Sequence, residues 1–145
     1  SKNFLNKKYK IISPSDVGFH NVLKNKSKFY FFDFEYAGFD DPSKMISDFF
    51  LQPKYDINLK YLKLFHSQLF KNDNRFDEIF LRTKIIMPIT AIKWTCIILG
   101  IFDKDVMDRR LFSNQNIKLD VIFKNAEKKF NHLGNNILKK KYEIY

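Results

Sequence analysis

Apolar positions recur at helical spacing through most of the second half of the chain. The pattern predicts an amphipathic helix over residues 59–70, with Leu62 and Phe65 on the apolar face and Lys60 and Lys63 outside. It also predicts helices over 76–83, 103–112 and 119–133, and we expect Gly134 to end or kink the last one. Residues 85–102 form a long apolar run, which predicts a buried core helix.

The first third of the chain has short alternating and aromatic runs, which favour β-structure. We expect a strand over 9–13, ended by Pro14. Residues 22–23 and 28–34 predict the two strands of a hairpin joined by 24–27. Residues 36–41 are expected to form a loop around Gly38.

A helix start follows that loop. Asp41 can cap the helix, Pro42 suits its first position, and Pro53 is expected to stop it. Met45, Ile46, Phe49 and Phe50 then share one apolar face. The predicted fold class is α+β, mostly α, in a single domain over residues 1–145.

Composition favours a packed interior. The chain of 145 residues is 45% apolar and contains 17 phenylalanines, so we expect the aromatic side chains to be buried at helical spacing. Cys96 is the one cysteine, which excludes an internal disulfide and favours a reducing compartment, so we expect a cytoplasmic protein. Cys96 and Trp94 are both expected in the core.

Two features of charge bear on partners. Lys93 lies in the middle of the apolar run, where it would cost about 2.5–3.5 kcal/mol in a bilayer, so no membrane partner is expected. The net charge of +10 attracts polyanions, and nucleic-acid binding is one interpretation that follows from it. We expect no nucleic-acid partner, because Lys139–Lys141 is most simply a solvated helix end.

Candidate chemistry is concentrated between Asp16 and Asp33. Asp16 and Asn21 form a D-x-x-x-x-N motif in a loop where Gly18 is free to take a positive φ. Asn21 starts one predicted strand and Asp33 ends its antiparallel partner, so the two ends are neighbours in space. Two carboxylates and a carboxamide form the all-oxygen ligand set that suits Mg²⁺ bound to substrate phosphates. The spacing matches the second half of the protein-kinase signature.

With these residues, the chain resembles the aminoglycoside phosphotransferase and choline kinase-like family, which has the protein-kinase fold. The match covers 13–53 and includes Asp33-Phe34-Glu35, Ala37-Gly38, Asp41-Pro42 and Asp48-Phe49. The resemblance implies a C-terminal lobe of a kinase-like fold, with its metal site on the small hairpin.

The resemblance also implies roles. Asp16 would be the catalytic residue, and Asn21 and Asp33 would bind the nucleotide and Mg²⁺, with Glu35 as a further metal ligand. Asp41 and Asp48 would support the loop. The implied reaction transfers the γ-phosphate of ATP or GTP to a hydroxyl of a sugar, aminoglycoside or amino-alcohol.

Two positions depart from the family pattern. Pro14 stands where the family usually has a histidine that braces the loop. We expect that His20 cannot fill that role directly, and we interpret it as a loop residue. Only fifteen residues precede Asp16, so we expect the nucleotide-binding lobe upstream in a longer chain or on another chain. The isolated chain is then expected to be inactive. The alternative function is that of a non-catalytic, kinase-like remnant that acts as a binding or interaction module.

Overall fold

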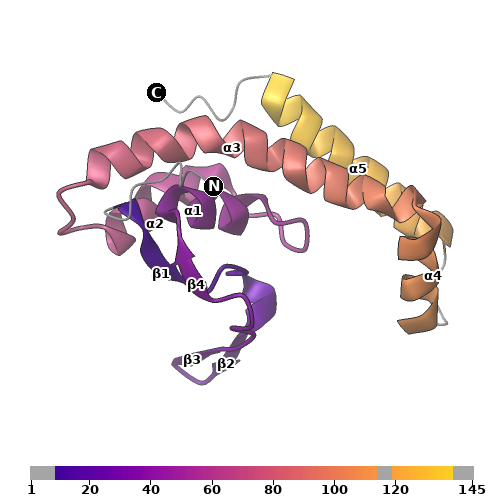
Figure 1. The fold of residues 1–145 in the computed structure, drawn as a ribbon, viewed down its shortest axis with the longest axis horizontal. Helices are drawn as coiled ribbons and strands as arrows, with labels where there is room; N and C mark the ends of the chain where they lie inside the picture. Colours follow the sequence, from indigo (N-terminus) through magenta and orange to yellow (C-terminus); the bar gives the residue numbers. More distant parts are fainter. Residues whose placement is uncertain (1–8, 114–118, 139–145) are drawn as a thin grey trace, which may run out of the picture. The chain divides into compact units, whose positions relative to one another are not determined.

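A computed structural model describes residues 9–113 and 119–138 (Figure 1). The chain divides into two compact units, Ser1–Thr90 and Ala91–Tyr145. The described residues confirm an α+β protein that is mostly helical. The single-domain interpretation stays a prediction, and Lys139–Lys141 lies outside the described residues.

Two small antiparallel sheets occupy the first unit. Strand β1 (Ile11–Ser13) pairs with β4 (Gly38–Asp40), and Ile12 lies opposite Phe39. The prediction of a loop over 36–41 is therefore wrong for its last part, because β1 supplies a partner that local sequence does not reveal. This pairing places the two ends of the segment 13–38 side by side, which fixes where the candidate site begins and ends.

The second sheet is the hairpin expected from the sequence. Strand β2 (Val22–Asn25) pairs with β3 (Lys28–Phe31), and Val22 lies opposite Phe31. The turn is tighter than predicted, since Asn25 pairs directly with Lys28 and Lys26 takes a left-handed conformation with φ 53°. Because β3 ends at Phe31, Asp33 follows the strand instead of lying within it.

Helix α1 (Pro42–Leu51) confirms the predicted start, stop and apolar face. The Asp41 side chain accepts a hydrogen bond from the backbone N–H of Ser43 at 2.9 Å, and Pro42 follows the cap. The helix ends two residues before Pro53. The four predicted apolar side chains of α1 are all buried, so this helix forms the centre of the first unit.

Helix α2 (Leu62–Leu69), which follows the short 3₁₀ helix η3 (Leu59–Tyr61), and the start of α3 (Phe76–Leu99) complete that core. Phe65 stacks on Phe49 of α1 with ring centroids 4.6 Å apart. His66 is fully buried among three phenylalanine rings: Phe70, Phe76 and Phe80.

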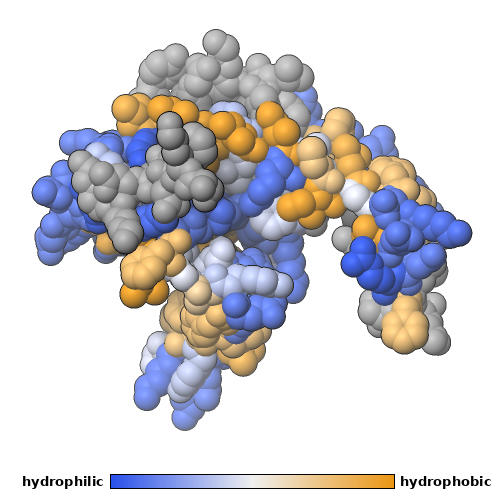
Figure 2. Space-filling view, viewed as in Figure 1, coloured by the Kyte–Doolittle hydropathy of each residue, from blue (hydrophilic) through white to orange (hydrophobic). Residues whose placement is uncertain are grey.

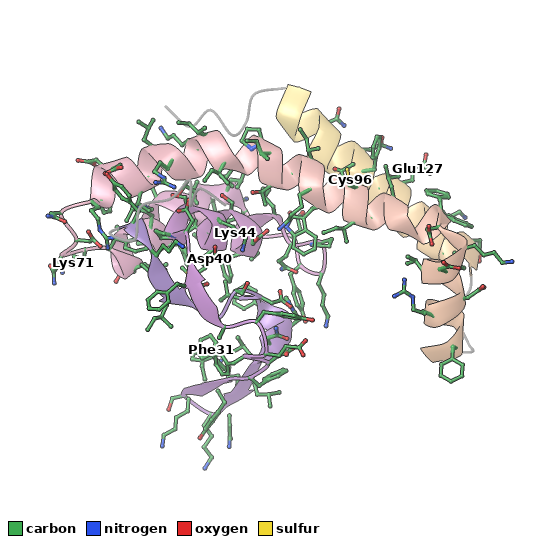
Figure 3. All side chains as sticks on the ribbon, viewed as in Figure 1. Phe31, Asp40, Lys44, Lys71, Cys96 and Glu127 are labelled. Atoms are coloured by element: carbon green, nitrogen blue, oxygen red, sulfur yellow. The ribbon has the colours of Figure 1, made fainter. Side chains whose placement is uncertain are left out.

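The apolar run over 85–102 is only partly a core helix. Helix α3 is continuous through Pro88, and Met87, Ala91 and Ile98 are buried. Ile85, Ile89 and Ile92 are more than half exposed, so the prediction of a buried core helix is wrong for these positions. Cys96 is exposed as well, and Trp94 is half-buried, which corrects both predictions (Figure 3). A helix needs only one apolar stripe to pack, and local apolarity does not say which residues face a neighbour.

The second unit contains the C-terminal end of α3, the 3₁₀ helix η4 (Gly100–Phe102), α4 (Lys104–Ser113) and α5 (Leu119–Leu138). Phe102 stacks on Phe123 of α5 at 5.2 Å. Helix α5 continues past Gly134, so that residue does not end it. None of the described helices has the length and apolar character needed to cross a membrane.

The aromatic side chains are less buried than composition suggests. Phe29, Tyr30 and Phe31 of β3 are 60%, 51% and 57% exposed, because the hairpin presents both faces to solvent. In Figure 2, pale orange residues lie above a hydrophilic tip at the hairpin turn. The expectation that aromatic residues are buried throughout is therefore wrong for the hairpin, although it holds for α1.

Candidate functional site

A strained turn presents Asp16 at the end of β1. The backbone N–H of Asp16 donates to the carbonyl of Pro14 at 2.8 Å, and the intervening Ser15 has φ 65°. A bond between residues i and i+2 around a positive φ has the pattern of a γ-turn, which is rare because it is strained. The buried hydroxyl of Ser13 accepts from the N–H of Ser15 at 3.0 Å and so secures the turn.

Asp16 is held at the surface by the next turn of the chain. Its side chain is 46% exposed, and His20 places Nε2 at 3.3 Å from both carboxylate oxygens. His20 belongs to the 3₁₀ helix η2 (Phe19–Asn21). Its contact with Asp16 corrects the interpretation of His20 as an ordinary loop residue. The signal that could have found it is the four-residue spacing from Asp16, which suits a side-chain pair within one turn of helix.

Gly18 serves this contact in a different way from the one predicted. Its φ is −174°, which is ordinary extended backbone, so positive φ is not the reason for glycine. A Cβ added here would lie 2.5 Å from Cε1 and 2.6 Å from Nδ1 of His20. Glycine is needed because the imidazole ring packs directly against the backbone.

Asn21 is buried beside Asp16, as the spacing of the motif predicts. Its Nδ2 donates to the backbone carbonyl of Asp16 at 2.9 Å and lies 3.5 Å from Oδ2 of the Asp16 carboxylate. The backbone carbonyl of Asn21 accepts from the N–H of Phe32 at 3.1 Å, which extends the hairpin pairing by one position. Because Nδ2 is engaged, the amide oxygen is the atom of Asn21 that can bind a cation.

Asp33 is the next residue after Phe32, which is hydrogen-bonded to Asn21. Asp33 has φ 65°, a left-handed conformation that is uncommon outside glycine and is concentrated at functional sites. The Asp33 and Glu35 side chains are exposed. The hairpin thus carries Asp33 towards the segment that holds Asp16 and Asn21, as antiparallel pairing predicts.

The pKa of the Tyr36 hydroxyl is affected by the carboxylates of Glu35, Asp33 and Asp16. The pKa of Tyr36 is raised above its ordinary value, first by a hydrogen bond with Glu35 and by the charge of that residue. Desolvation adds to the shift, and so do the negative charges of Asp33 and Asp16. Three carboxylates therefore act on one exposed hydroxyl. Sequence reasoning did not single out Tyr36.

The donor set fits a hard cation such as Mg²⁺. Exposed carboxylates at Asp33 and Glu35, with the amide oxygen of Asn21, are oxygen ligands of the preferred kind, and Mg²⁺ keeps waters in its remaining positions. Among the described residues, no group of three or more histidines, cysteines or acidic side chains is arranged to hold a metal.

The two residues predicted to support the loop both belong to the region of α1: Asp41 is its N-cap, and Asp48 lies within the helix. Asp41 caps α1 and also forms an ion pair with Arg82 of α3. Asp48 is buried, and its carboxylate lies 3.5 Å from Nζ of Lys44. Lys44 also pairs with Asp40, the last residue of β4, at 2.6 Å (Figure 3). These contacts connect α1 to β4, which pairs with the strand that leads into Asp16.

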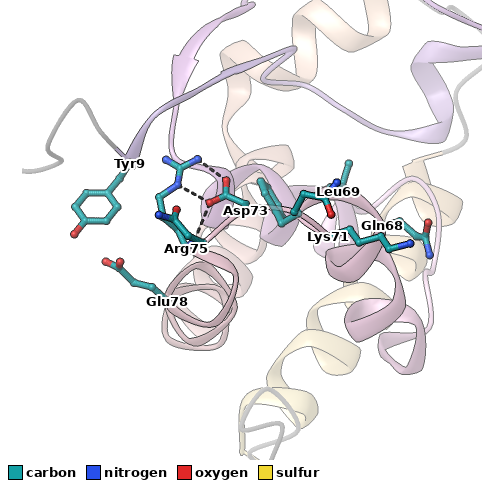
Figure 4. Close-up of a pocket in the computed structure, with 10 residues that line it drawn as sticks. Tyr9, Gln68, Leu69, Lys71, Asp73, Arg75 and Glu78 are labelled. Carbon is teal, nitrogen blue, oxygen red and sulfur yellow. Dashed lines mark hydrogen bonds and ion pairs between the residues drawn. The ribbon is translucent and has the colours of Figure 1, made fainter.

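An open pocket of about 1050 Å³ lies elsewhere in the first unit, at the connection between α2 and α3 (Figure 4). Its wall includes Tyr9, Gln68 and Glu78, together with Arg75, which binds Asp73 through two hydrogen bonds of 2.9 and 2.6 Å. The hydrogen bonds from Arg75 lower the pKa of Asp73 to about 2. None of the predicted site residues lines this pocket, and its charged pair is internally satisfied.

Comparisons of the chain with protein-family models, with curated proteins and with solved structures found no match.

Proposed function

We propose that this chain is the catalytic lobe of a small-molecule phosphotransferase with a kinase-like fold. It would transfer the γ-phosphate of ATP or GTP to a hydroxyl of a sugar, aminoglycoside or amino-alcohol. One observation carries the proposal: Asn21 is hydrogen-bonded to Asp16, and the same Asn21 pairs with the residue before Asp33. Asp33, twelve residues after Asn21 in sequence, therefore directly follows the residue that is hydrogen-bonded to Asn21.

The backbone strain supports the same proposal. Ser15 and Asp33 are two of the three described residues, glycine aside, that have a positive φ, and each adjoins or forms part of the site. Such conformations cost about 1–3 kcal/mol each and persist where the surrounding structure holds them. Asp is tolerated there better than most residues, so the cost at Asp33 is at the low end.

The roles follow from position. Asp16, exposed at the tip of its turn, would orient the acceptor hydroxyl and accept its proton late in transfer. The amide oxygen of Asn21 and the carboxylate of Asp33 would hold Mg²⁺, with Glu35 as a further ligand. When bound, the metal supplies positive charge that stabilises the transferring phosphoryl group. The chain itself supplies position and electrostatics, which is what phosphoryl transfer chiefly requires.

The exposed apolar side chains of the hairpin favour the proposal that a second lobe packs against it. A two-stranded hairpin with apolar side chains on both faces is marginal by itself in water. Leu23 and Tyr30 form one cross-strand pair, both exposed, and Val22 and Phe31 form the next, on the opposite face. We propose that a nucleotide-binding lobe covers part of this surface.

The same surface favours the second candidate function, a non-catalytic binding module. In that case the hairpin would dock a protein partner, and the chain would not bind nucleotide. Experiment can distinguish the two functions. A binding module would form stable complexes with its partner, and neither Asp16→Ala nor chelation of Mg²⁺ would affect them.

The test uses the full-length protein that contains this chain. Transfer of labelled phosphate from Mg²⁺-ATP or Mg²⁺-GTP is measured with an aminoglycoside, choline and glucose as acceptors. We expect Asp16→Ala to abolish transfer with an unchanged circular dichroism spectrum. Glu127→Ala, which removes an exposed carboxylate from α5, is the control and should be fully active (Figure 3). Full activity of Asp16→Ala would refute the assignment.

A further inference from the structure

We infer that His20 is a positioning residue that holds the Asp16 carboxylate in the orientation needed for transfer, an inference that rests on the proposed function. Pro14 occupies the place where a bracing histidine would be expected, and proline has no side-chain donor. His20, which follows Asp16 in the chain, contacts the Asp16 carboxylate itself.

The geometry is that of a shared hydrogen bond. Nε2 of His20 lies 3.3 Å from Oδ1 and 3.3 Å from Oδ2, so the ring faces both oxygens equally. Asn21 Nδ2 approaches Oδ2 at 3.5 Å and is anchored on the Asp16 carbonyl. The carboxylate is therefore contacted from His20 and Asn21, which are consecutive in η2, while nearly half of its surface is open to an acceptor.

The ring is fixed by its surroundings. The His20 side chain is only 16% exposed, and it packs so closely on Gly18 that no Cβ would fit there. Nδ1 is buried, and among the described residues it has no hydrogen-bond partner. A proton on Nδ1 would therefore bury an unsatisfied donor and would leave the Nε2 lone pair facing the carboxylate. The arrangement assigns the proton to Nε2, which donates to Asp16.

The first arm of the test is spectroscopic and uses the 145-residue chain. Long-range ¹⁵N–¹H correlation at pH 8, where an ordinary histidine is neutral, identifies the tautomer of each ring. We expect His20 with its proton on Nε2, and we expect Asp16→Asn to move the equilibrium towards Nδ1–H, because an amide can donate to Nε2. A wild-type ring protonated on Nδ1, or a tautomer ratio that Asp16→Asn leaves unchanged, would overturn the contact.

The second arm measures phosphate release from Mg²⁺-ATP, with water as acceptor, in the full-length protein that contains this chain. His20→Met fills a similar volume without a donor, whereas His20→Gln keeps an N–H at a comparable reach. We expect His20→Met to lower kcat about tenfold to hundredfold with an unchanged KM for ATP. His20→Gln should recover most of kcat. His66→Phe, which changes a buried histidine far from the loop in sequence, should leave both constants unchanged.

The outcomes separate the two proposals. Equal kcat for His20→Met and His20→Gln, in an active wild type, would overturn the positioning role and leave the proposed function standing. A wild type that releases no phosphate and binds no Mg²⁺-ATP in calorimetry would overturn the proposed function and the positioning role together. In that case the tautomer of His20 still shows whether its Nε2–H donates a hydrogen bond to Asp16.

Discussion

Asp41 has two structural tasks, and their energies can be separated by substitution. One carboxylate oxygen accepts from the backbone N–H of Ser43 and caps α1, and the other pairs with Arg82 of α3. A cap of this kind contributes about 1 kcal/mol. The ion pair is partly screened, since the side chains of Asp41 and Arg82 are 15% and 26% exposed, so we assign it about 1 kcal/mol as well.

Three variants test this division. Asp41→Ala removes both interactions and should lower the free energy of unfolding by about 2 kcal/mol. Asp41→Asn keeps an oxygen for the cap but loses the charge, so it should lose about 1 kcal/mol. Arg82→Met leaves the cap in place and removes the ion pair, together with the contact between the guanidinium and the ring of Tyr9 at 5.5 Å, and should also lose about 1 kcal/mol. For a chain of this size, the loss in Asp41→Ala corresponds to a fall in Tm of about 4–8 °C.

The assay is urea unfolding of the 145-residue chain, monitored by far-ultraviolet circular dichroism, with m-values compared between variants. The double variant Asp41→Asn/Arg82→Met should be no less stable than either single variant, because all three lack the same interaction. If Asp41→Asn and Asp41→Ala were equally destabilised, the cap would contribute nothing. If Asp41→Ala lost less than about 0.5 kcal/mol, both assignments would fail.

Three further predictions concern metal, pH and packing. Asp33→Asn should weaken Mg²⁺-dependent binding of ATP in calorimetry at least about tenfold, because an amide replaces a charged ligand; equal affinity in the variant would exclude Asp33 as a ligand. Burial lowers the pKa of His66, only partly opposed by the charge of Asp77. The unfolded state therefore binds more protons, and stability should fall as pH drops below about 6.5 and level off below the folded pKa. His66→Phe should flatten this dependence in urea unfolding at pH 5–8, and an unchanged slope would contradict it. Met87→Ala removes a fully buried side chain and should cost about 2–5 kcal/mol, against less than about 0.5 kcal/mol for the control Ile89→Ala, which is 65% exposed.

Local signals in the sequence were sufficient for several elements. The cap, the proline and the apolar spacing of α1 all act within one segment, so the start, stop and buried face of that helix could be predicted. The hairpin could be predicted for the same reason, since its strands are adjacent in the chain. Its exact turn could not, because the residues around Lys26 carry no glycine to indicate where the left-handed position falls.

Contacts between distant segments were not predictable. Strand β4 exists because β1 pairs with it, and the sequence around Gly38 taken alone indicates a loop. The exposure of Ile89 and Cys96 depends on which side of α3 meets other elements. Periodicity in a continuous apolar run does not encode that choice.

The candidate site shows the same division. The sequence by itself determined which residue types are present, and the spacing of Asp16, Asn21 and Asp33 was enough to predict that they converge, because antiparallel pairing of adjacent strands is a local event. Only the tertiary structure decided how Asp16 is held. The contact with His20 depends on a strained turn at Ser15 and on the close approach of the ring to Gly18. Such contacts depend on the three-dimensional path of the backbone, which residue spacing does not specify.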